Sequence, residues 1–133
     1  MKIIDIEGIG PAKAEKLKAV GIDTTADFLA SAATAKDRAA LSEKTGIAEQ
    51  LLLEWANHVD LMRIDGVGSE YADLLEAAGV DSCPELAQRN PANLTATLRE
   101  INDNKSLVRQ VPSESMVEKW VVEAAKLPKV ITH

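Results

Sequence analysis

The sequence predicts an all-α protein built from two degenerate repeats, and three observations lead to that fold class. Alanine and leucine are plentiful, whereas glycine and proline number only seven and five, a composition that favours helix. Apolar residues recur at helical spacing between capping signals, and no stretch alternates as a half-buried strand requires. The chain also aligns with itself when it is shifted by 58 residues.

The self-alignment superimposes the most constrained residues of the chain. The Gly-Ile-Gly stretch at 8–10 recurs as Gly-Val-Gly at 66–68. The two tryptophans, Trp55 and Trp120, match only at an offset of 65, so the second copy carries about seven extra residues. We therefore expect a first repeat over residues 1–60 and a second over 61–133, each a small helical bundle, packed as one pseudo-symmetric unit around one core.

Each repeat is expected to begin with a glycine turn and a short helix. Gly8 and Gly10 permit a tight turn because glycine tolerates positive φ, and Ile9 between them is expected to insert into the core. A helix follows over about residues 11–20, with Pro11 at its first position and Gly21 as a left-handed C-cap. On this interpretation Gly10→Val clashes or strains the backbone and destabilises the protein more than a surface substitution does.

Polar residues predict the starts of later helices. The stretch 24–27, Thr-Thr-Ala-Asp, reads as an acidic variant of the capping box, and the stretch 82–85, Ser-Cys-Pro-Glu, as its standard form. Thr34 is expected to begin another helix, and Asn90 with a following proline to begin its counterpart. These signals give about four helices in each repeat.

The last parts of the two repeats differ. Gly46 ends one helix and precedes another over about residues 48–62, which buries Trp55 and also serves as the first helix of the second repeat. The stretch 106–116 is special to the second repeat and either covers its core or forms a partner site. The stretch 127–133 leaves its helix at a proline, and its aliphatic residues are expected to dock on the body.

Each repeat is expected to contain a helix, a Gly-hydrophobic-Gly turn and a second helix that ends at a Gly-hydrophobic pair. This arrangement resembles the helix-hairpin-helix motif of DNA repair, replication and recombination proteins. The stretches GIGPAKAEKLKAVGI, LLLEWANHVDLMRIDGVGSEYADLLEAAGVD and LPKVITH are similar to the bacterial family called domain of unknown function 4332. The resemblance covers the whole chain. It implies a tandem helix-hairpin-helix fold of SAM-like helical bundles.

The resemblance also implies a contact between the hairpin and a phosphate. In such proteins the unpaired N–H groups at the start of the second helix, together with the helix dipole, form an anion site. Carried onto this chain, the nucleic-acid-binding positions are Gly8, Ile9, Gly10, Ala12, Lys13 and Lys16. The corresponding second set is Gly66, Val67, Gly68, Glu70 and Tyr71.

Charge separates the two hairpins. The net charge of −6 argues against a general attraction to nucleic acid or to an anionic membrane. From Gly8 to Gly21 the chain carries Lys13, Lys16 and Lys18 against one acid, whereas the stretch from Asp65 to Gly79 carries four acids and no base. We therefore expect weak, sequence-independent contact with a nucleic-acid backbone through the first hairpin only.

Two other interpretations remain open at the level of sequence. The acidic second hairpin is an alternative site, at which the chain acts as a protein-protein interaction adaptor and binds a protein partner. Its interface residues are Glu70, Tyr71 and Asp73, with Tyr71 expected to be exposed. The glycine turns can also be purely structural, as a way to pack two short helices closely.

An enzymatic role is not expected, and neither is a cofactor or a metal. Nucleotide-binding, dinucleotide-binding and zinc motifs are missing, and the two histidines, His58 and His133, lack the spacing of a metal site. Cys83 sits near a helix start, where a thiol pKa falls, but no histidine is near it in sequence.

The sequence also leads to expectations about localisation and assembly. A single cysteine indicates a reducing cytoplasm, and no apolar run is long enough to span a bilayer. We expect a monomer or a weak dimer joined through the tail.

Overall fold

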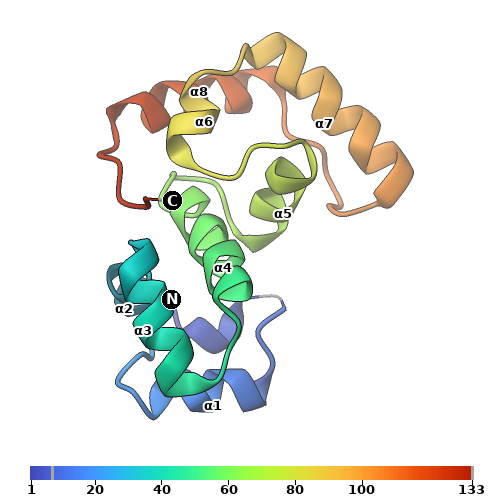
Figure 1. Cartoon of the computed structure of the whole chain (residues 1–133). Helices are drawn as coiled ribbons and strands as arrows, with labels where there is room; N and C mark the ends of the chain where they lie inside the picture. The colour runs from blue at the N-terminus through green and yellow to red at the C-terminus, as the bar shows by residue number, and fades with distance from the viewer. Residues whose placement is uncertain (7, 133) are drawn as a thin grey trace. The chain divides into compact units, whose positions relative to one another are not determined.

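The computed structural model describes residues 1–6 and 8–132, and it confirms the predicted all-α fold (Figure 1). Within the described residues the only β-type pairing is an isolated bridge between Lys2 and Thr24. The elements are the 3₁₀ turn η1 (Ile3–Asp5) and the helices α1 (Pro11–Lys18), α2 (Thr25–Ser31), α3 (Ala35–Thr45), α4 (Glu49–Leu61), α5 (Ser69–Ala77), α6 (Cys83–Ala87), α7 (Pro91–Lys105) and α8 (Glu114–Lys126). None of the helices in this part of the chain combines the length and apolarity that a membrane crossing needs.

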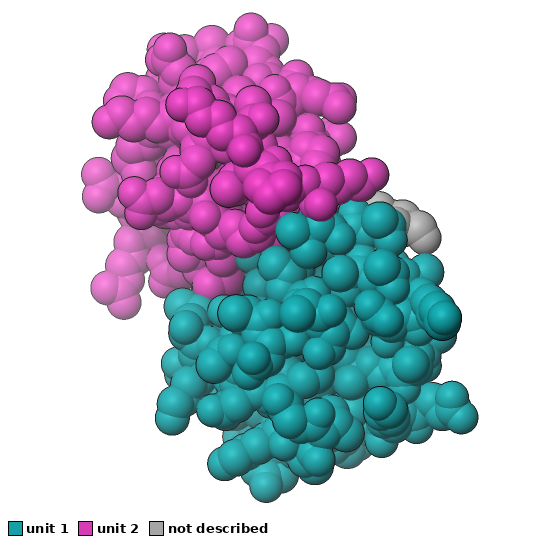
Figure 2. Space-filling view, turned by 90° about the vertical axis from the view of Figure 1, so that its left-hand side faces the viewer, with its two compact units in different colours: residues 1–59, 130–133 teal, residues 60–129 magenta. Residues whose placement is uncertain are grey.

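The chain divides into two compact units, coloured separately in Figure 2. Unit 1 comprises residues 1–59 together with 130–133, and unit 2 comprises residues 60–129. Unit 1 contains η1, α1, α2, α3 and most of α4, and unit 2 contains α5, α6, α7 and α8. His133, which the sequence analysis considered as a metal ligand, lies outside the described residues.

The buried side chains form two separate clusters, whereas the sequence predicted one shared core. The cluster of unit 1 includes Phe28 and Trp55, whose rings meet edge to face with their centroids 6.3 Å apart. The cluster of unit 2 includes Leu98 and Trp120. Two cores form because the short helices of each unit bury their apolar faces against one another.

Local capping occurs where the sequence predicts it. The Thr24 hydroxyl accepts a hydrogen bond from the Asp27 N–H at 3.1 Å, and the Asp27 carboxylate accepts one from the Thr24 N–H at 3.3 Å. The same N-cap bond is made by the side chains of Thr34, Ser82, Asn90 and Ser113. Gly46 ends α3 in the left-handed conformation, with φ of 75°. These bonds fix helix starts and ends independently of the packing around them.

The stretch 106–116 covers the core of unit 2, which was one of its two predicted roles. Ser106, in the left-handed region with φ of 50°, ends α7. The Asn102 amide then holds Val108 at both backbone groups, accepting from its N–H at 2.9 Å and donating to its carbonyl at 3.1 Å. Val108 is buried in the unit 2 cluster as a result. The predicted docking of the last residues is also confirmed, because Ile131 is buried in the core of unit 1.

Candidate functional site

The first hairpin turn is closed by a hydrogen bond from the Ile9 N–H to the Ile6 carbonyl, 3.2 Å long. Gly8 occupies the third position of this turn with φ of +92°, which favours glycine strongly. Ile9 is 4% exposed, so its side chain anchors the turn in the core of unit 1 as predicted. The second turn repeats this arrangement, with a 3.0 Å bond from Val67 to Ile64 and φ of +88° at Gly66.

The second glycine of each pair behaves differently from the sequence-based expectation. Gly10 has φ of −77° and ψ of 167°, which is extended backbone that any residue adopts. No atom lies within 4 Å of the position that a Cβ on Gly10 or on Gly68 would take. The prediction that Gly10→Val clashes or strains the turn is therefore wrong. The requirement for positive φ belongs to the first glycine of each pair.

The N-terminus of α1 presents backbone donors that receive no side-chain hydrogen bond from its N-cap residue, Gly10. Gly10 is the N-cap and has no side chain to accept a hydrogen bond, and Pro11 at the first position has no N–H. The first intrahelical bond of this turn runs from Ala14 to the Gly10 carbonyl, so the N–H groups of Ala12 and Lys13 have no partner within the helix. The first turn of α1 also contains no acidic residue.

Two lysines flank these donors. Lys13 and Lys16 are both exposed, on successive turns of α1. The Lys13 ammonium nitrogen lies 5.8 Å from the centroid of the Trp55 ring, within the range of a cation–π attraction. This contact holds one positive charge beside the start of the helix. The structure thus brings together the predicted positions Gly8, Gly10, Ala12 and Lys13, with Lys16 one turn further along.

The second hairpin offers a different surface. Glu70 is exposed in the first turn of α5, and Asp73 is half-buried. Tyr71 was expected to be exposed, but it is half-buried. Its ring centroid lies 5.2 Å from that of Trp120, and its hydroxyl donates to the Gln110 carbonyl at 3.1 Å. The expectation overlooked the extra residues of the second repeat, which supply that carbonyl acceptor.

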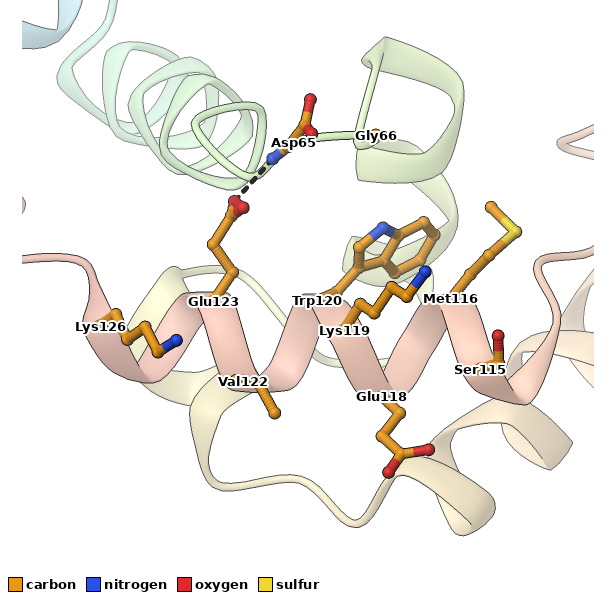
Figure 3. A pocket seen from close by; sticks show the side chains of 10 residues that line it. All are labelled: Asp65, Gly66, Ser115, Met116, Glu118, Lys119, Trp120, Val122, Glu123 and Lys126. Atoms are coloured by element: carbon orange, nitrogen blue, oxygen red, sulfur yellow. Dashed lines mark hydrogen bonds between the residues drawn. The ribbon is translucent and has the colours of Figure 1, made fainter.

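An open groove of about 790 Å³ lies beside the second turn, in unit 2, and sequence reasoning did not find it. Figure 3 shows Met116 and Trp120 reaching from α8 toward the turn. The Asp65 N–H of the turn donates to the Glu123 carboxylate at 2.7 Å, which ties the turn to α8 (Figure 3). The groove is lined by Asp65, Gly66, Ser115, Met116, Glu118, Lys119, Trp120, Val122, Glu123 and Lys126. Val122 lines the groove and is 51% exposed, an exposure that only the structure reveals.

Cys83 is buried, and its surroundings oppose the thiolate. The Cys83 N–H donates to a carboxylate oxygen of Asp60 at 2.9 Å, and the thiol contacts the Asp60 carbonyl at 3.1 Å. Burial raises the pKa of the Cys83 thiol to about 12, and the negative charge of Asp60 adds to the effect. A helix start can lower a thiol pKa, but desolvation and the charge of Asp60 outweigh that effect at Cys83. Asp60 is itself 1% exposed and pairs with Arg63 at 2.8 Å.

Comparison with known proteins identifies the family of the chain. No curated protein and no solved structure matches it. The family model described as "Domain of unknown function (DUF4332)" matches residues 7–127, which include both hairpins, the groove and the Asp60–Cys83 contacts. The chain therefore belongs to the DUF4332 family.

Proposed function

We propose that this protein is a non-catalytic binding module that contacts a nucleic-acid backbone weakly, and without reading sequence, through the first hairpin. One juxtaposition supports the proposal: the start of α1, whose N-cap Gly10 supplies no side-chain hydrogen bond, lies beside the exposed Lys13 and Lys16. A phosphate oxygen can accept hydrogen bonds from the N–H groups of Ala12 and Lys13, and the helix dipole favours its charge. The Lys13 ammonium, held over Trp55, adds a second attraction.

The contrast between the hairpins supports the choice of the first one. Both helices begin at a glycine N-cap that supplies no side-chain hydrogen bond. However, the first turn of α5 contains Glu70, whereas that of α1 contains no acid. A carboxylate that lies about 4 Å from a phosphate costs about 1 kcal/mol in water and more at a drier contact. Tyr71, which replaces Lys13 in the second hairpin, brings no charge and is engaged with Gln110.

The expected affinity is low because the contact is small. One hairpin provides two or three phosphate contacts, and proteins that make many more still bind non-specifically at about 10⁻⁴ to 10⁻⁶ M. We therefore expect a dissociation constant of about 10⁻⁴ M or weaker at physiological salt, for any sequence. The net charge of −6 adds a repulsion that keeps the contact weak.

The test is a titration of labelled duplex and single-stranded DNA at about 20 mM salt, where electrostatic contacts are strongest. We expect binding that weakens as salt rises, and that is lost in the double variant Lys13→Glu, Lys16→Glu. The matched control is Lys36→Glu, Lys44→Glu, which changes the net charge equally at two exposed positions of α3. Absence of binding at low salt, or equal loss in both double variants, contradicts the proposal.

A second candidate function, protein-interaction adaptor, is favoured by the groove of unit 2. Its exposed Val122 and half-buried Met116 offer apolar contact area, with the acidic Glu70 of α5 in the same unit. We expect a protein partner to be recovered by wild-type bait and lost by a Val122→Asp, Glu70→Lys bait. Identical recovery by the two baits contradicts the adaptor role.

A further inference from the structure

The residues Val130–Thr132, here called the strap, belong to unit 1 although the preceding helix α8 belongs to unit 2. The Thr132 N–H donates to the Ala33 carbonyl at 2.8 Å, and the Arg38 guanidinium donates to the Thr132 carbonyl at 2.6 Å. Both bonds are made by Thr132, and Ile131, the residue before it, is 3% exposed in the core of unit 1. The strap is thus held at two backbone groups and one aliphatic side chain. We call its binding site on unit 1, formed by Ala32, Ala33, Arg38 and the pocket of Ile131, the strap seat.

An empty strap seat is unfavourable. Arg38 is 4% exposed, and one of its terminal nitrogens already donates to the Ala32 and Ala33 carbonyls at 2.9 and 3.0 Å. Its other terminal nitrogen is directed to the carbonyl of Thr132. Removal of the strap takes that acceptor from a buried cation and uncovers the pocket of Ile131. Both changes cost free energy, so the seat requires an occupant.

The chain between α8 and the strap is suited to act as a hinge. The helix ends at Lys126, and Leu127 is already extended, with φ of −80° and ψ of 138°. Pro128 and Lys129 are exposed, whereas Leu127 packs against the core of unit 2, and the Pro128 carbonyl accepts a hydrogen bond from the Arg63 guanidinium at 3.0 Å. The strap can leave its seat through rotations after the proline ring, at the ψ of Pro128 and at Lys129, while α8 stays folded.

We propose that the strap seat is an interaction site for a second copy of this chain, filled in trans by that copy's strap. Recognition depends on a backbone carbonyl, a backbone N–H and one branched aliphatic side chain, which is the chemistry of an added extended segment. The strap of a second copy presents these groups in the same order, so exchange replaces each lost contact with an identical one. When each of two copies places its strap in the seat of the other, both seats are filled. A reciprocal exchange therefore limits the assembly to a two-fold dimer.

The intramolecular strap is favoured at ordinary concentrations because a short linker gives it an effective concentration in the millimolar range. We therefore expect wild-type protein to be monomeric at micromolar concentration. Exchange becomes visible when the intramolecular contact is disabled. The proposal does not depend on nucleic-acid binding by the first hairpin.

The experiment mixes two full-length variants that complement each other. Arg38→Gln has an impaired seat and an intact strap, whereas Ile131→Asp has an intact seat and an impaired strap. Each alone is expected at monomer mass, and an equimolar mixture near about 0.5 mM, comparable to the effective concentration, is expected to show a heterodimer by light scattering. With only the Ile131→Asp chain labelled with ¹⁵N, its Ala33 and Arg38 signals should shift on addition of the Arg38→Gln chain.

The control partner is the double variant Arg38→Gln, Ile131→Asp, which has neither an intact seat nor an intact strap. It should shift no signal of the labelled Ile131→Asp chain. If the first variants lose their helical circular dichroism, the milder pair Arg38→Lys and Ile131→Ala replaces them. A mixture of folded variants that stays at monomer mass without signal shifts overturns the proposal, and so do equal shifts with the control partner.

Discussion

The two glycines of the first hairpin should differ in how much the same substitution destabilises the protein. Gly8 has φ of +92° and Gly10 has φ of −77°, and no atom lies within 4 Å of a Cβ built at either position. A steric contact therefore contributes to neither Gly8→Ala nor Gly10→Ala. The difference between them reports chiefly the cost of placing an L-residue at positive φ, with the N-cap preference of Gly10 as a smaller second contribution.

The size of the difference follows from the backbone angles. Placing a residue with a Cβ in the left-handed region costs roughly 1–2 kcal/mol, so Gly8→Ala should destabilise by about that amount. At Gly10, alanine restricts the unfolded chain, which stabilises by about 0.4–1 kcal/mol, but it is a poorer N-cap than glycine. These two effects nearly cancel, so Gly10→Ala should stay within about 0.5 kcal/mol of wild type.

Urea denaturation followed by tryptophan fluorescence measures both variants, because Trp55 lies in the same core as Ile9 of the turn. The slope should be unchanged, so that the midpoint reports stability. Melting gives a second readout, at roughly 4–8 °C for each kcal/mol in a domain of 60–100 residues. Equal midpoints for Gly8→Ala and Gly10→Ala would refute the assignment of the positive φ to Gly8 and with it the geometry of the turn.

Further predictions concern three buried or capping groups. Asp60→Ala should destabilise by about 3 kcal/mol in urea, because it removes the acceptor of the Cys83 N–H and of one terminal nitrogen of Arg63; a loss below about 1 kcal/mol would contradict that role. Cys83 should resist a thiol reagent at pH 8 until the protein unfolds, and rapid labelling of folded protein would show that the thiol is accessible. Because burial raises the folded pKa of this thiol to about 12 from 9.0, its contribution to stability is complete below about pH 9 and is lost as pH rises toward 12. Hydrogen bonds from Thr24 lower the pKa of Asp27 below 3.8, so its stabilising effect is present above that pH and disappears as pH falls through the folded pKa. An NMR titration of Asp27 with a midpoint at or above 3.8 would be inconsistent with the cap.

The local elements of this fold were predictable because their causes lie within a few residues. The bond from the Asp27 N–H to Thr24 spans three residues, and so do the caps at Thr34 and Asn90. Helix α4 was expected over about residues 48–62 and runs from Glu49 to Leu61. The self-alignment likewise pointed to two equivalent turns, and Gly8 and Gly66 share nearly the same positive φ. The helix-hairpin-helix arrangement itself stays a prediction from resemblance.

The sequence by itself determined the helices, their caps and the paired glycine turns, because hydrogen bonds between near neighbours and the freedom of glycine act before any packing. Tertiary structure alone decided what each turn can do. It placed the Lys13 ammonium over Trp55, joined Tyr71 to Gln110, and surrounded Cys83 with Asp60. It also joined Arg38 to Thr132, 94 residues away. Such contacts depend on which helix faces meet, and a pattern that repeats every few residues carries no information about that.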